Sequence, residues 1–365
     1  MSKEKTIKYT STNEQIQSLI SKGLVINDID FAREKLEQYG YYNIINSYKA
    51  PYLYNENGQK RFKKDTSFEQ LFSLFTFDHN LRNAIMSSML ALEEHLKAVS
   101  AEVLASSFGT SQNDYLKWEN FRDRKVSHER FGLKYTLGTL QRNLMSGKDP
   151  IRYYRDTYGI VPPWILFKGT YFSTIINFVR LFKAKQKNQL TKLLYDCSDE
   201  LCNTKDIKTL LFNTLSLCSE YRNLAAHGGR VYNYIPDATI MLEEPTSLLE
   251  LAPDIEELFI RPGLPVLLNS LSLLSYKEPY EIINIALKQE LNRHLDLYEQ
   301  DLDILGETLQ LTIFTERQDC IVYGGKEYPI TAIIQSGFNG VLIKDMPEEL
   351  REMMNSENKD FHKKN

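Results

Sequence analysis

Three residues near position 225 combine the side chains that metal-free cleavage of RNA would need. Arg222, Asn223 and His227 lie in a stretch that reads YRNLAAHGGRVYNY over residues 221–234. An arginine can hold a phosphate, and an imidazole titrates near neutral pH, where it can both accept and donate a proton. Asn223 and His227 are four residues apart and therefore share one face of a helix, and the long side chain of Arg222 can reach the same edge.

The reaction that these residues predict is attack of a ribose 2′-OH on its adjacent phosphate, giving a 2′,3′-cyclic phosphate and a 5′-hydroxyl. Arg222 would stabilise the developing charge, His227 would act as acid or base, and Asn223 would orient either partner. One histidine cannot easily make both proton transfers in a single step, so a homodimer that joins two copies would complete the site. The structural alternative is that His227 and Asn223 only cap the helix end while Arg222 forms a buried ion pair.

A second histidine, His128, also follows arginines at a similar spacing. Arg122, Arg124 and Lys125 precede it. No apolar stripe of helical period runs through residues 121–128, so we expect a loop or a frayed helix there. These three basic residues are predicted to contact RNA phosphates, or to form a solvated face, rather than to make a catalytic pair.

The helix that positions the first set is predicted to run from about Lys205 to His227. The pair Gly228-Gly229 would end it, since glycine is favoured just beyond a helix C-terminus. Its apolar face consists of Leu211, Leu215, Cys218 and Ala225, widened by Leu217, Tyr221 and Leu224.

Other helix signals surround this one. Ser11 and Glu14 form a capping-box pattern, and Asn27 or Asp28 would cap a second helix through Tyr39. A helix of more than 30 residues is expected to begin near Ser67, and another is expected to begin at Pro162-Pro163 and to carry Ile165 through Phe182. Two further helices are expected over Ile260–Leu274 and Pro279–Leu297. Short strands are expected at Thr312–Phe314, Cys320–Tyr323 and Tyr328–Ile334, with Gly324-Gly325 as a turn.

The charge of the chain is divided unevenly along its length. Residues 1–235 contain 33 Lys+Arg and 24 Asp+Glu, a net of +9, whereas residues 236–365 contain 11 and 24, a net of −13. A basic body can hold a polyanion through its phosphates, which favours RNA or DNA as a partner. The acidic region would either cover that surface or face away from it.

Composition excludes several classes of protein. No apolar run approaches the ~20 residues that span a bilayer, and the N-terminus lacks the apolar core of a signal peptide, so a cytoplasmic protein without membrane contact is expected. The four cysteines have no CxxC spacing and no nearby histidine, so we expect reduced thiols, no metal and no cofactor.

Three ordered motifs resemble the Abi-like (abortive infection) family of the HEPN superfamily. The family pattern Arg-Asn-x-x-x-His, followed by Arg-x-Tyr-Asn, is matched by Arg222, Asn223, His227, Arg230, Tyr232 and Asn233. The stretch Leu71–Arg82 and the segment Pro162-Pro163-Trp164 are similar to two further family motifs, and Tyr41-Tyr42 fits its N-terminal region. The likeness covers roughly residues 15–235. Many members carry a second histidine after the first, whereas this chain has Gly228, which has no side chain that could transfer a proton.

The resemblance implies a mainly α fold with a HEPN-like helical bundle over residues 65–235. The sequence pattern adds a tyrosine-rich helical extension over residues 1–64 and an acidic region of helices and short strands over residues 236–365. The resemblance also implies bacterial antiphage or toxin–antitoxin defence by a dimeric, metal-independent endoribonuclease, with an antitoxin as a further partner. Arg230, Tyr232 and Asn233 would then contact RNA. Two alternatives stay open: a non-catalytic module that holds a small noncoding RNA, and a structural helical adaptor.

Overall fold

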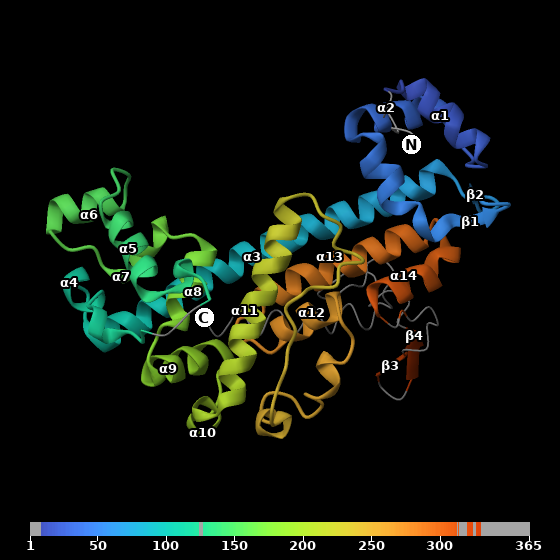
Figure 1. Cartoon of the computed structure of the whole chain (residues 1–365). Helices are drawn as coiled ribbons and strands as arrows, with labels where there is room; N and C mark the ends of the chain where they lie inside the picture. The colour runs from blue at the N-terminus through green and yellow to red at the C-terminus, as the bar shows by residue number, and fades with distance from the viewer. Residues whose placement is uncertain (1–8, 124–126, 312, 314–319, 324–325, 330–365) are drawn as a thin grey trace, which may run out of the picture. The chain divides into compact units, whose positions relative to one another are not determined.

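A computed structural model describes residues 9–123, 127–311, 313, 320–323 and 326–329. The fold is mainly α, as predicted, and Figure 1 shows helices along most of the described chain. The described strands form two antiparallel pairs: β1 (Leu53–Glu56) with β2 (Gln59–Phe62), and β3 (Cys320–Tyr323) with β4 (Lys326–Pro329). The strands of the β1–β2 hairpin were not anticipated from the sequence, and Asn57 and Gly58 in its turn both have positive φ.

The chain divides into two compact units, one of residues 1–82 and 286–365 and one of residues 83–285. The three regions inferred from the sequence remain a prediction. The described helices and their bounds are α1 (Thr12–Ser21), α2 (Ile29–Tyr39), α3 (Phe68–Phe108), α4 (Gln112–Tyr115), α5 (Leu133–Leu144), α6 (Ile151–Tyr158), α7 (Pro163–Leu166), α8 (Phe172–Arg180), α9 (Ala184–Tyr195), α10 (Asp199–Asn203), α11 (Lys205–Ala226), α12 (Leu264–Ser272), α13 (Glu278–Leu295) and α14 (Leu302–Leu309).

The N-terminal helices begin where their capping residues predict. The Ser11 side chain accepts from the Glu14 backbone N–H, and the Glu14 carboxylate accepts from the Ser11 N–H, which completes the capping box of α1. Asp28, rather than Asn27, caps α2 by accepting from the Phe31 N–H. The strand predicted at Thr312–Phe314, the turn at 324–325 and residues beyond Pro329 lie outside the described residues.

A buried polar network holds together the first unit. The carboxylate of Asp301 accepts hydrogen bonds from the Tyr52 hydroxyl at 2.6 Å, the Gln70 amide at 2.8 Å and His294 Nε2 at 2.9 Å. The other ring nitrogen of His294 bonds Ser73 Oγ at 2.9 Å. A serine, a histidine and an aspartate are the types of a catalytic triad, but these are only 6%, 0% and 1% exposed, so the network is structural.

The tyrosine-rich extension contributes to this core as well as to the surface. Tyr48 is 2% exposed and donates to buried Asp78 at 2.7 Å, and Tyr52 is 3% exposed. Tyr42, in contrast, is 72% exposed. Packing therefore explains Tyr48 and Tyr52, whereas the ring of Tyr42 stays exposed.

The prediction of one continuous helix from Pro163 through Phe182 is wrong. The segment consists of the short α7, a 3-10 turn over Phe167–Gly169 and the separate helix α8. Gly169 packs so closely against Ile151 that an added Cβ would lie 2.9 Å from Ile151 Cδ1, and Thr170 is extended. The basic residues between Arg180 and Lys192 lie largely on α9, which begins at Ala184.

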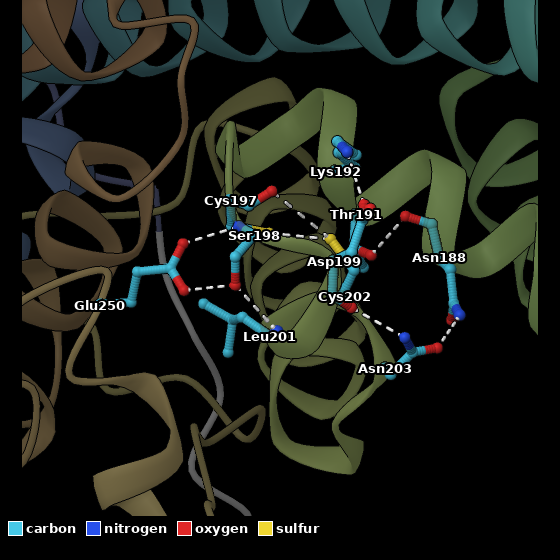
Figure 2. A network of polar contacts seen from close by, with 10 residues as sticks. All are labelled: Asn188, Thr191, Lys192, Cys197, Ser198, Asp199, Leu201, Cys202, Asn203 and Glu250. Carbon is cyan, nitrogen blue, oxygen red and sulfur yellow. Dashed lines mark hydrogen bonds and ion pairs between the residues drawn. The ribbon is translucent and has the colours of Figure 1, made fainter.

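The corner between α9 and α10 is held by polar contacts around two buried thiols, shown in Figure 2. Asp196 ends α9 in the left-handed conformation, and Cys197 Sγ lies 3.0 Å from Cys202 Sγ. The Glu250 carboxylate accepts from both the N–H and the hydroxyl of Ser198, at 2.6 Å each, and these bonds lower the pKa of Glu250. This carboxylate ties the corner to the acidic region of the chain.

These thiols are expected to react slowly while the protein is folded. Burial, and next the hydrogen bond with Cys202, raises the pKa of Cys197 to about 12, and the thiolate is the reactive form. At about pH 8 we expect iodoacetamide to label Cys197 at least ~100-fold more slowly in the folded protein than in urea. Peptide mapping by mass spectrometry reads each thiol separately, and labelling of folded Cys197 at the rate seen in urea would contradict this account.

Candidate functional site at the C-terminal end of helix α11

Helix α11 carries the candidate catalytic residues on its last turns. Thr204 caps its start by accepting from the Ile207 N–H, and the helix ends at Ala226, within one residue of the prediction. The predicted apolar stripe is buried at these positions: Leu211, Leu215, Leu217, Cys218, Tyr221 and Ala225. Burial of this stripe fixes the rotation of α11 and so decides which way Arg222, Asn223 and His227 face.

The helix ends in a two-glycine turn that fixes the position of His227. The Gly228 N–H donates to the Ala225 carbonyl at 3.2 Å, and the Gly229 N–H donates to the Leu224 carbonyl at 2.9 Å. Gly228 has φ +72°, a left-handed conformation that disfavours side chains. This pair of bonds is the Schellman motif. The position where the resemblance led us to expect a second histidine is therefore occupied by the residue that turns the chain.

A side chain at Gly229 is expected to destabilise the fold because it would crowd Leu224. A Cβ there would overlap Leu224 Cδ1, and would lie 2.8 Å from Leu224 Cγ and 3.2 Å from its carbonyl oxygen. We expect Gly229→Ala to lower the free energy of unfolding by about 1–3 kcal/mol, as overpacking does. The loss should shrink in a Leu224→Ala background. Gly147→Ala is the matched control, since a Cβ at Gly147 meets nothing within 4 Å. If Gly229→Ala and Gly147→Ala have the same free energy of unfolding in urea titrations, a Cβ at Gly229 does not crowd Leu224 as described.

The side chains of the three candidate residues reach the surface. Asn223 and His227 are exposed, and Arg222 is half-buried. Arg222 Nη1 donates to Asn223 Oδ1 at 3.4 Å, which brings the guanidinium to the edge that carries Asn223. Among the described residues, no carboxylate pairs with Arg222 and no group bonds the His227 ring. The buried ion pair of the structural alternative is therefore not present in the described part of the chain.

The segment after the helix anchors the site by burying two of its residues. Val231 and Tyr232 are 0% and 3% exposed, whereas Arg230 and Asn233 are exposed. RNA contact by Arg230, Tyr232 and Asn233 stays a prediction. The exposure of Arg230 and Asn233 suits that role, and the burial of Tyr232 suits packing.

Two carboxylates on α11 then direct the chain back along the helix (Figure 1). Glu220 accepts from the backbone N–H groups of Asp237 and Ala238, each at 3.0 Å. Fourteen residues earlier, Asp206 accepts from the N–H groups of Glu243 and Glu244, again at 3.0 Å each. The first part of the acidic region therefore lies along α11. Neither carboxylate was singled out from the sequence: Asp206 lies in the first turn of α11, and Glu220 lies among the apolar residues of its second half.

Tyr234, which lies beside Glu220, packs where the chain turns back along α11. The Tyr234 ring packs edge-on against Tyr221 with centroids 5.3 Å apart. Burial, and then the charge of Glu220, raises the pKa of Tyr234. Burial likewise raises the pKa of Tyr221, which is 0% exposed. Both phenols therefore stay protonated near neutral pH and stabilise the helix end without a charge.

The second basic cluster lies at another place in the same unit. The Arg122 N–H donates to the carbonyl of Leu181, at the end of α8, and the Arg122 side chain is exposed. His128 is exposed and its ring lies 6.1 Å from that of Phe131. Arg124 and Lys125 lie outside the described residues. Phe121–Asp123 are not helical, which agrees with the loop expected there.

The described residues contain no group of three or more His, Cys, Asp or Glu side chains that could hold a metal ion. No helix in the described ranges is long and apolar enough to cross a bilayer.

Comparison with known proteins identifies the family. The family model of the Abi-like proteins matches residues 34–233, more than half of the chain. Its match ends at Asn233, the last residue of the motif that follows α11. No curated protein matches the chain, and no solved structure does. The chain therefore belongs to the Abi-like protein family.

Proposed function

We propose that the protein is a metal-independent endoribonuclease whose site is built at the C-terminal end of α11 and completed by a second copy of the chain. Membership of the Abi-like family indicates a role in abortive infection. Placement in the HEPN superfamily, antiphage or toxin–antitoxin activity, a cytoplasmic location and an antitoxin partner are parts of this proposal.

The observation that carries the proposal is the state of the three side chains. Arg222 reaches Asn223, and the exposed His227 ring has no bonding partner among the described residues. A guanidinium can neutralise charge on a phosphate in the transition state. An exposed imidazole can move a proton to or from the reacting oxygen. All three groups lie within six residues at the end of one helix, which favours fixed positions of their side chains relative to one another.

A second copy supplies what one chain lacks. Attack by the 2′-OH needs a base, and departure of the 5′-oxygen needs an acid, whereas one chain offers a single histidine at this place. A two-fold axis near the end of α11 would place two Arg222–His227 sets opposite each other, since a symmetric dimer uses the same surface twice. The exposed positions of Asn223 and His227 leave this end of the helix open to such a contact.

Mixing His227→Ala with wild-type protein tests the shared site. Arg222→Ala and His227→Ala alone should each be inactive on RNA in EDTA. If each site needs one His227 from each chain, a dimer of one wild-type and one His227→Ala chain is inactive, and random pairing of equal amounts leaves about a quarter of the dimers fully wild-type, so the mixture should have about a quarter of the activity of the same amount of wild-type protein. About half of that activity, in a mixture shown to form mixed dimers, would contradict the shared site. Full activity of either single variant would contradict the proposed function itself.

A further inference from the structure

Exposed aromatic rings are concentrated in one part of the second unit. Between Tyr135 and Tyr171 these large apolar side chains are at least 40% exposed: Tyr135, Met145, Tyr153, Tyr158, Ile160, Trp164 and Tyr171. Tyr171 is the most exposed of them, at 79%. Exposed rings that gather in one region mark a surface that binds a partner. None of these residues belongs to the candidate site on α11.

Three segments of this region are tied together and form what we call the α5–α6 surface: the end of α5 with residues 145–150, helix α6, and residues 168–171. Asn143 Nδ2 on α5 donates to the Gly169 carbonyl at 3.1 Å and to Thr170 Oγ1 at 3.3 Å. Arg155 Nη1 on α6 donates to the carbonyls of Leu144 at 2.8 Å and Ser146 at 3.0 Å. These bonds hold Tyr171 and the exposed residues of α6 on one rigid part of the fold.

The rings of α6 are held in a fixed arrangement. Tyr153 lies edge-on to Tyr158, with centroids 5.9 Å apart, and Tyr154 lies 5.5 Å from Tyr158. Tyr153 and Tyr158 are still 52% and 59% exposed. Rings that are fixed by one another and open to solvent lose little conformational entropy when a planar ligand stacks on them.

The α5–α6 surface is also positively charged. Residues 142–158 and 168–171 contain five Lys+Arg and two Asp+Glu, a net of +3. Both acids are already paired: Asp149 with Arg152 at 2.8 Å and Asp156 with Arg155 at 2.9 Å. Lys148 and Lys168 are exposed, and among the described residues no carboxylate lies within 4.0 Å of either. These lysines can therefore meet an external anion without first breaking an ion pair.

We propose that the α5–α6 surface binds single-stranded RNA, with bases stacked on Tyr153, Tyr158 or Tyr171 and phosphates held by Lys148 and Lys168. Flat rings interleaved with cations are what a single strand needs, because every base offers a π-face and every linkage a charge. A duplex hides its bases within the helix, so the rings would add little to its binding. This inference rests on the proposed function for the identity of the nucleic acid and assigns it a holding surface apart from α11.

Binding of an uncleavable strand tests this surface separately from cleavage. The probe is a fluorescein-labelled, 2′-O-methyl single-stranded oligoribonucleotide of mixed sequence, titrated with the full-length protein in EDTA and followed by anisotropy. Since each stacked base contributes roughly tenfold in affinity, Tyr171→Ala is expected to weaken binding about tenfold. Tyr153→Ala should act in the same direction, and Tyr171→Phe, which keeps the ring, should bind within about twofold of the wild type.

Two controls sharpen the test. Tyr42→Ala removes an exposed tyrosine of the other unit and should leave affinity unchanged. A duplex of the same sequence should lose less than about twofold on Tyr171→Ala, because its bases are not free to stack. Unchanged single-strand affinity in both Tyr171→Ala and Tyr153→Ala, with thermal unfolding like that of the wild type, would overturn the inference and leave the surface to a protein partner.

The two proposals fail in different ways. If the wild type binds the modified strand through Tyr171 but leaves ordinary RNA intact, the surface stands and the nuclease does not. If ordinary RNA is cleaved while Tyr171→Ala and Tyr153→Ala bind like the wild type, the nuclease stands and the surface does not.

Discussion

Replacing His227 with alanine is expected to lower the rate of RNA cleavage by about 10²–10⁴-fold, the range that a general acid or base contributes. The imidazole is exposed and bonds no other group among the described residues, so its removal should not disturb the fold. The backbone bonds that end α11 do not involve the ring. The rate is measured with a labelled single strand in EDTA, together with the thermal unfolding of each variant.

His128→Ala provides the matched control for this prediction. His128 is also exposed and also follows arginines, but it lies beside Phe131 and not on α11. We expect its removal to change cleavage less than about twofold. If His128→Ala and His227→Ala lowered the cleavage rate equally, the loss would not be specific to His227, and the assignment of the α11 site would fail. A His227→Ala protein as active as the wild type would remove the imidazole from the mechanism.

Replacing Asp301 with alanine is expected to lower the free energy of unfolding of the first unit by about 3–5 kcal/mol. Asp301 is 1% exposed and accepts from Tyr52, Gln70 and His294 at 2.6–2.9 Å. The substitution removes the acceptor that three buried donors share, and a buried donor left unsatisfied costs about 1–3 kcal/mol. Urea unfolding of the full chain, followed by circular dichroism, measures the loss.

Asp303 is the control for Asp301 because it lies two residues away and is exposed. Asp303→Ala should change the free energy of unfolding by less than about 0.5 kcal/mol, as surface substitutions usually do. If Asp301→Ala and Asp303→Ala unfold at the same urea concentration, the buried network does not stabilise the unit as described.

Local signals made the helix around the site predictable. The apolar stripe of α11, the cap at its start and the glycine pair at its end are all encoded within about 25 residues, and the helix ends within one residue of the expected place. The same holds for α1 and α2, whose capping residues lie next to the helices they start. Neighbouring residues determine such features, so a single sequence contains enough to find them.

Features that depend on distant residues could not be found in this way. At the break between α7 and α8, Gly169 lies against Ile151, which comes from another helix. Asp301 meets Gln70 across 231 positions of sequence. The acidic region returns along α11 because Asp206 and Glu220 accept its backbone N–H groups. Tyr232 is part of a recognisable motif, but only the fold shows that its ring is buried.

The most direct test of the central claim is the chemistry of the RNA ends. The wild-type protein is incubated with a 5′-labelled single strand in EDTA, and the product ends are identified by mass spectrometry. Attack by the 2′-OH at the α11 site predicts 2′,3′-cyclic phosphate and 5′-hydroxyl ends that form with the wild type and are lost with His227→Ala. Intact RNA with the wild type, 5′-phosphate ends, or cyclic ends that persist in His227→Ala would contradict the claim.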